Sequence, residues 1–95
     1  MNYNELTKLA NEQIDYFMKE ANKCDSPNRI DEARINCGYA FGTYQLWASA
    51  SREMALKSKN NGVAMMNKIN QQCEIFEDMM DKKKIPAFKH LYKND

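Results

Sequence analysis

The spacing of apolar residues at the start of the chain predicts a long amphipathic helix. Apolar side chains recur every three or four positions from Tyr3 to Cys24, which is the spacing of one helix face. Charged residues fill the opposite face. Asn2 precedes this stripe and Glu5 follows it by three residues, as in a capping box. We therefore expect a helix from about Tyr3 to Cys24 with one buried and one solvated face.

A second, longer helix is expected from about Pro27 to Ser58. Ser26 is suited to cap it, and Pro27 is tolerated in its first turn, where the missing N–H costs nothing. This segment carries two apolar stripes where the first helix has one. One stripe consists of Ile30, Ala33, Cys37, Phe41, Tyr44, Ala48, Ser51 and Ala55, and the other of Ile35, Tyr39, Gly42 and Leu46.

The middle of this second helix, from Ile35 to Ser51, contains no charged residue, although 28% of the whole chain is charged. A helix with a single buried face normally carries charges on its outer face. We therefore expect this helix to contact neighbours on more than one side. At 1.5 Å per residue it is roughly 45–50 Å long, so it overhangs neighbours of roughly 30–33 Å. A second copy of the chain is the expected cover, and a bend near Gly38 and Gly42 is the alternative.

A third helix and a short last helix complete the pattern. The Asn-Gly pair at 61–62 predicts a turn, and an apolar stripe follows it from about Val63 to Lys83. Asn60 or Asn61 is expected to cap this helix, and the lysines at its end suit the helix dipole. Pro86 is expected to open a short helix that folds back on the others.

The composition agrees with an all-helical chain, because only three Gly and two Pro occur in 95 residues. Usage rich in Asn, Lys and Ile and poor in Arg is typical of AT-rich genomes, including many phage genomes. The net charge of +1 excludes strong steering towards nucleic acid or membranes.

We expect the chain to be cytoplasmic. Cys24, Cys37 and Cys73 have no metal-like spacing, which favours buried thiols in a reducing compartment. The first residues lack the pattern of a signal peptide, and the uncharged segment is too short and too polar to span a bilayer.

Gly38 and Gly42 lie four residues apart on one side of the second helix. Each Gly inside a helix costs about 1 kcal/mol relative to Ala, so another interaction must offset that cost. Close helix packing is the main expectation, and a kink or a ligand lying on exposed backbone are the alternatives. The oligomer interface is accordingly predicted at Ile35, Gly38, Tyr39, Gly42, Leu46 and Trp47.

Two further binding hypotheses use the basic residues. All three Arg belong to the second helix, and an anion or nucleotide pocket at an oligomer interface would use Arg34, Tyr39, Tyr44, Trp47 and Arg52. The alternative for these Arg is pairing with nearby carboxylates. Nucleic acid binding by the tail would use Lys82, Lys83, Lys84, Lys89 and Lys93, for which a solvated helix end is the alternative.

No catalytic pattern is found. His90 is the only His and has no nucleophile or carboxylate placed beside it in the sequence. Phosphate loops and clusters with metal-ligand spacing are missing from the sequence, so neither a metal nor another cofactor is expected.

The sequence thus predicts one all-α domain over residues 1–95: a three-helix antiparallel bundle with a long central helix, a short C-terminal helix and an oligomeric state. We expect a non-enzymatic accessory or inhibitory factor, of a kind that phages encode, that occupies a surface of a larger macromolecule. Its partners would be itself and an unidentified protein. The small-ligand and nucleic-acid hypotheses remain as alternatives.

Overall fold

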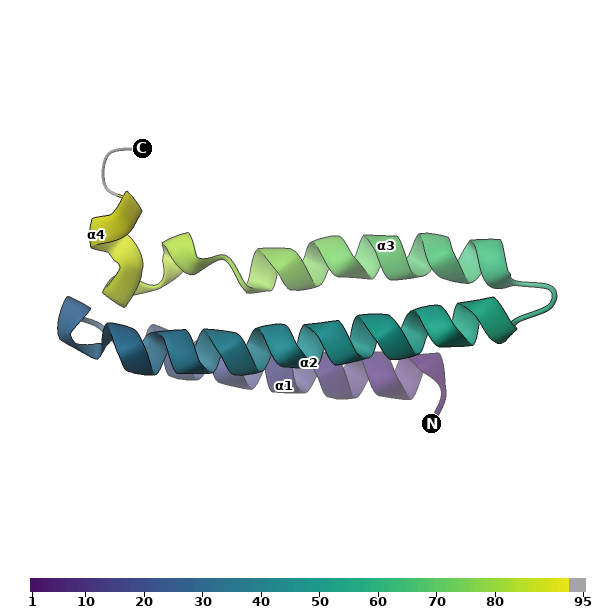
Figure 1. Cartoon of the computed structure of the whole chain (residues 1–95), viewed down its shortest axis with the longest axis horizontal. Coiled ribbons are helices and arrows are strands. Elements are labelled where there is room, and N and C mark those ends of the chain that lie inside the picture. The colour runs from purple at the N-terminus through teal and green to yellow at the C-terminus, as the bar shows by residue number, and fades with distance from the viewer. Residues whose placement is uncertain (93–95) are drawn as a thin grey trace.

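The regular structure is all helical in a computed structural model that describes residues 1–92 (Figure 1). Four α-helices are present in this range, and three short 3-10 turns connect or extend them. The helices are α1 (Tyr3–Asn22), α2 (Ile30–Lys57), α3 (Gly62–Met79) and α4 (Lys89–Tyr92), and the turns are η1 (Pro27–Arg29), η2 (Lys82–Lys84) and η3 (Pro86–Phe88).

The start of α1 is a capping box, as the sequence predicts. The Asn2 side chain accepts a hydrogen bond from the Glu5 amide at 2.8 Å, and the Glu5 carboxylate accepts one from the Asn2 amide at 3.4 Å. Beyond the end of α1, Arg29 Nη1 donates to the Lys23 carbonyl at 2.9 Å. This bond satisfies one of the carbonyls that a helix end leaves without a partner.

The connection to α2 differs from the prediction at its first turn. Ser26 makes no side-chain capping bond, and Pro27 opens a 3-10 turn in place of the α-helix. From Ile30 onwards α2 runs without interruption to Lys57, through both Gly38 and Gly42.

The third helix ends four residues earlier than predicted, at Met79 where the sequence indicated Lys83. The Asp81 carboxylate accepts a hydrogen bond from the Lys83 amide at 3.0 Å and starts η2. The lysines therefore follow α3 and do not occupy its last turn, so that part of the prediction was wrong. At the other end, Asn61 holds the capping position, but its side chain makes no capping bond.

Consecutive long helices run in opposite directions, with α1 and α2 side by side and α3 returning along α2 (Figure 1). Their main core includes Ile14 of α1, Trp47 of α2 and Phe76 of α3, each exposed by 1% or less. The Trp47 and Phe76 rings meet edge to face at 4.9 Å. The indole N–H of Trp47 donates to Thr7 Oγ1 at 2.9 Å, so this buried donor is satisfied.

A second buried cluster closes the opposite end of the molecule. Ile85, Ala87 and Phe88 pack against Cys24 and Cys37 where α1 ends and α2 begins. The Ala87 amide donates to the Cys24 carbonyl at 3.1 Å. The tail thus folds back as predicted. It also covers the first turns of α2, so the apolar residues of this cluster are buried within one chain.

The resulting shape is long and flat, about 50 × 27 × 14 Å along its principal axes. In so thin a molecule, α1 and α3 can cover only part of the circumference of α2. The uncovered part is the candidate functional surface.

Candidate functional site

One side of α2 is exposed and carries no charge over four turns. We call this surface the outer face of α2, and it consists of Ile35, Gly38, Tyr39, Gly42, Leu46 and Ser49. Ile35 and Tyr39 are each 56% exposed, and Leu46 is 71% exposed. Scattered exposed apolar side chains are normal on a protein surface, but a contiguous uncharged helix face is not.

The two glycines on this face have open space in front of them. A Cβ placed on Gly38 or on Gly42 would meet no atom within 4 Å, apart from the backbone of α2 itself. No other described helix therefore packs closely on them, and α2 has no break at either position. Close packing within the chain is thus not the interaction that offsets the cost of these glycines.

Trp47 does not belong to the outer face. It is 1% exposed and lies in the main core, so it cannot contribute to an interface as we had predicted. One residue corresponds to a rotation of about 100° around a helix, and this rotation carries Trp47 from the exposed side of Leu46 towards α1 and α3.

An apolar hollow extends the outer face onto α1. It has a volume of about 220 Å³ and its lining includes Leu6 and Leu9 of α1 and Leu46 of α2. Tyr39 of α2 also contacts α1, since the centre of its ring lies 5.2 Å from that of the Phe17 ring. The surface available to another molecule thus spans both helices.

The residues predicted to bind an anion do not converge on one cavity. Arg34 and Arg52 are 18 positions apart on one helix, which separates them by about 27 Å. Arg34 Nη1 lies 3.5 Å from an Asp31 carboxylate oxygen, so the ion-pair alternative holds for it in part. Arg52 lines a different hollow, together with Tyr44.

Tyr44 is committed to a contact within the chain. Its hydroxyl donates to the Glu77 carboxylate at 2.8 Å, and its ring stacks on Trp47 at 6.2 Å. Burial, together with the hydrogen bonds to Cys73 and Glu77, raises the pKa of Tyr44 well above its usual value. It therefore ties α2 to α3.

The basic tail is partly occupied by contacts of its own. Lys84 Nζ lies 3.6 Å from an Asp78 carboxylate oxygen, and Lys83 Nζ lies 5.9 Å from the centre of the Tyr92 ring. Lys89 is exposed on α4, and Lys93 lies outside the described residues. Nucleic acid binding by the tail stays a prediction.

The three cysteines are buried and free, as expected. Burial raises the pKa of the Cys24 and Cys37 thiols, so both stay protonated near neutral pH and are weak nucleophiles. Among residues 1–92, no group of three or more His, Cys, Asp or Glu side chains is placed to hold a metal ion.

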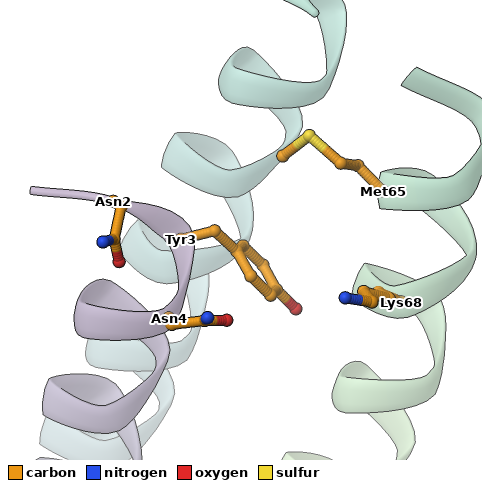
Figure 2. A pocket seen from close by; sticks show the side chains of 5 residues that line it. All are labelled: Asn2, Tyr3, Asn4, Met65 and Lys68. Atoms are coloured by element: carbon orange, nitrogen blue, oxygen red, sulfur yellow. The ribbon is translucent and has the colours of Figure 1, made fainter. Parts of the chain in front are cut away.

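A pocket that the sequence did not indicate lies between the start of α1 and α3 (Figure 2). It has a volume of about 310 Å³ and is lined by Asn2, Tyr3, Asn4, Met65 and Lys68. Figure 2 shows the Tyr3 ring projecting across it towards Lys68. Helix periodicity describes one helix at a time, so a pocket between two helices that are distant in the sequence leaves no signal in it.

The chain matches no protein-family model, and no curated protein or solved structure was found to be similar to it. Within residues 1–92, no helix is both long enough and apolar enough to cross a membrane.

Proposed function

We propose that this chain is a small non-enzymatic binding protein. It is an antiparallel three-helix bundle that self-associates through the outer face of α2 and acts as an accessory or inhibitory factor on a surface of a larger macromolecule. The observation that supports this proposal is the exposed, uncharged outer face itself, which the described part of the chain leaves uncovered.

Charge favours a second copy as the occupant of this face. Two uncharged faces meet without bringing like charges together, whereas a charged partner surface would lose hydration and gain no opposite charge.

Shape favours the same occupant. Gly38 precedes Gly42 by four residues, and Leu46 follows Gly42 by four. An antiparallel pairing with its two-fold axis at Gly42 therefore places each Leu46 over the partner's Gly38. Leu46 is the most exposed large side chain of the face, and no atom stands in front of Gly38. This self-complementary arrangement is what a two-fold interface requires.

The size of the face sets the expected strength. From Ile35 to Ser49 it is about 21 Å long and about 11 Å wide, or roughly 250 Å², whereas a standard interface buries about 800 Å² per partner. Leu9 and Tyr16 of α1, both exposed, must therefore contribute. We expect a weak dimer with a dissociation constant in the micromolar range.

Cysteine crosslinking tests this register. Gly42→Cys should form a disulfide-linked dimer under mild oxidation, because the two-fold axis brings both copies of position 42 together. Ser49→Cys is the matched control. It is also exposed and lies on the same face. Its two copies would be about 21 Å apart. The native thiols are buried and should not react. Equal crosslinking at the two positions would reject this pairing.

Sedimentation and X-ray scattering over a concentration series test the assembly itself. The chain has a radius of gyration of 15.5 Å. Side-by-side pairing at ordinary helix spacing should raise it only to about 17–19 Å as the mass doubles. End-to-end pairing would give about 30 Å. Leu46→Lys should abolish the mass increase, whereas Gln45→Lys, which lies beside the outer face, should retain it. A monomer throughout the series would remove the support for self-association.

Action on a larger macromolecule needs its own experiment. Immobilised chain would be exposed to extract of the native host, and each captured component would be purified and tested again for direct binding. Direct binding that survives purification supports this part of the proposal. A component that is lost on purification, or no capture at all, contradicts it.

A further inference from the structure

A second hollow, which shares only Gly38 with the outer face, brings together two cations that the sequence separates by 48 positions, Arg34 of α2 and Lys82 of η2. Its volume is about 370 Å³, and its lining consists of Arg34, Cys37, Gly38, Phe41, Met80 and Lys82. All six residues belong to one chain, so the hollow is complete in the monomer. In the proposed dimer the partner's Leu46 would lie over Gly38, so a ligand and a second copy would compete for that position.

The polar side of this hollow is positively charged. No carboxylate is among its lining residues, and two side chains with a full positive charge are. Arg34 pairs with Asp31 only at 3.5 Å, and the side chains of both are more than half exposed, so the pair is weak and easily exchanged for a ligand. Lys82 lies close enough to Cys37 for its charge to oppose the effect of burial on the pKa of that thiol. The planar guanidinium of Arg34 can donate two parallel hydrogen bonds, and the ammonium of Lys82 adds a second positive charge. Together they suit an oxyanion with two negative charges.

The remaining walls are apolar and leave room for a flat group. Phe41 offers an aromatic face, and Met80 offers a polarisable thioether that packs well against rings. At Gly38 the backbone of α2 is open, with space where a Cβ would stand. The sequence allowed three explanations for Gly38 and Gly42: close helix packing, a kink, or a ligand lying on exposed backbone. The open backbone at Gly38 fits the last of these.

We propose that this hollow binds a small organic phosphate monoester, with the phosphate between Arg34 and Lys82 and its apolar or aromatic group over Gly38, against Phe41 and Met80. The volume is at the lower end of the range for ligand pockets, so it accommodates one ring and one phosphate. The outer face has no cation, and the pocket of Figure 2 has one, Lys68, with amides opposite. Neither matches a dianion as well.

Phenyl phosphate is the probe, followed by amide NMR shifts and calorimetry at constant ionic strength. It should bind in a saturable manner and more tightly than inorganic phosphate, which lacks the ring. Benzyl alcohol, which lacks the charge, should not bind measurably. Loss of one charge-assisted contact in Arg34→Gln or Lys82→Gln should weaken phenyl phosphate binding about tenfold.

Two control variants each remove one positive charge at a position outside the hollow. Arg52→Gln lies on the same helix and Lys89→Gln in the same tail, and both should bind like the wild type. Gly38→Leu should abolish binding by filling the floor, and it should not unfold α2, since Leu is a better helix former than Gly.

Three results would overturn the proposal: no saturable binding, equal binding of inorganic phosphate and phenyl phosphate, or equal losses in the Arg34 and Arg52 variants. Binding is measured at chain concentrations below self-association, where no partner covers Gly38, so none of these results depends on the dimer. Arg34→Gln and Lys82→Gln should still dimerise if the proposed function holds, so the two proposals can fail independently.

Discussion

At the scale of single residues, Ser51 is the one buried polar side chain in residues 1–92 without a hydrogen-bond partner. It is fully buried on the core side of α2, and its hydroxyl finds neither a donor nor an acceptor. A buried hydroxyl left unpaired loses the hydration that it has in the unfolded chain.

Ser51→Ala should therefore raise the free energy of unfolding by about 1–2 kcal/mol in urea titrations. Ser49→Ala is the matched control. It lies two residues away on the exposed side of the same helix and should gain only the helix-propensity difference, about 0.5 kcal/mol. A loss of stability in Ser51→Ala would show that the hydroxyl has a partner in solution.

Because of Tyr44, we expect the free energy of unfolding to depend on pH in the alkaline range. Burial raises its pKa in the folded chain, so between the ordinary value of about 10 and the raised value only the unfolded chain loses this proton. The folded state then binds more protons than the unfolded state, and stability falls as the pH rises through this window.

Tyr44→Phe removes that contribution. Near pH 8 the variant should be less stable by about 1 kcal/mol, because the bond to Glu77 is lost. The difference from the wild type should shrink above about pH 10. Tyr16→Phe, at an exposed position, is the control for the substitution itself and should change the free energy of unfolding near pH 8 by less than about 0.5 kcal/mol. A Tyr44→Phe profile that runs parallel to the wild type up to pH 11 would refute this assignment.

At the scale of helices, the glycines of α2 can be compared with Gly62 at the start of α3. Gly42→Ala places a Cβ in open space and should stabilise the monomeric chain by about 1 kcal/mol. A Cβ on Gly62 would lie 3.1 Å from the Ala55 carbonyl oxygen, a crowded distance, so Gly62→Ala should gain little or lose stability.

Thermal melts at concentrations below self-association measure both variants. An equal gain in stability from Gly42→Ala and Gly62→Ala would mean that Gly62 is not crowded by the Ala55 carbonyl in solution, which would contradict this prediction. If only Gly42→Ala raises the stability of the chain, and it also weakens the dimer, then the stability lost by having Gly at position 42 is offset by closer contact in the dimer.

Helix scale is also where the sequence was most informative. Apolar spacing located three long helices because each buries a face, and burial requires the three- or four-residue repeat. The end of α3 could not be predicted, since it depends on one local bond, from the Lys83 amide to the Asp81 side chain. Either an α-helical turn or a 3-10 turn is compatible with that run of residues.

The candidate site was predictable only in part, because the spacing of residues along one helix does not report its contacts with other elements. The absence of charge located the segment that carries the outer face, from Ile35 to Ser51, but not the rotation of α2, which buries Trp47. The phosphate hollow joins Arg34 to Lys82, and their proximity follows from where η2 lies after α3 ends. A pattern read along one helix contains no information about that contact.

At the scale of the whole molecule, stability depends on two buried clusters at different ends of a long, flat molecule. Trp47 and Phe76 are in one cluster and Phe88 in the other, and Met18 of α1 packs against both. Because α1 and α2 run through both clusters, loss of one should destabilise the other. We therefore expect a single unfolding transition.

Phe88→Ala tests this coupling. It removes a side chain that is 2% exposed and should lower the free energy of unfolding by about 3–5 kcal/mol. Leu91→Ala, at a position of α4 that is 53% exposed, should change it by less than about 0.5 kcal/mol. The fluorescence of Trp47 reports on the distant cluster, and circular dichroism reports on all helices. If the two ends unfold together, both signals shift to lower urea by the same amount in Phe88→Ala. A fluorescence transition that stays at the wild-type midpoint would mean that the tail opens by itself.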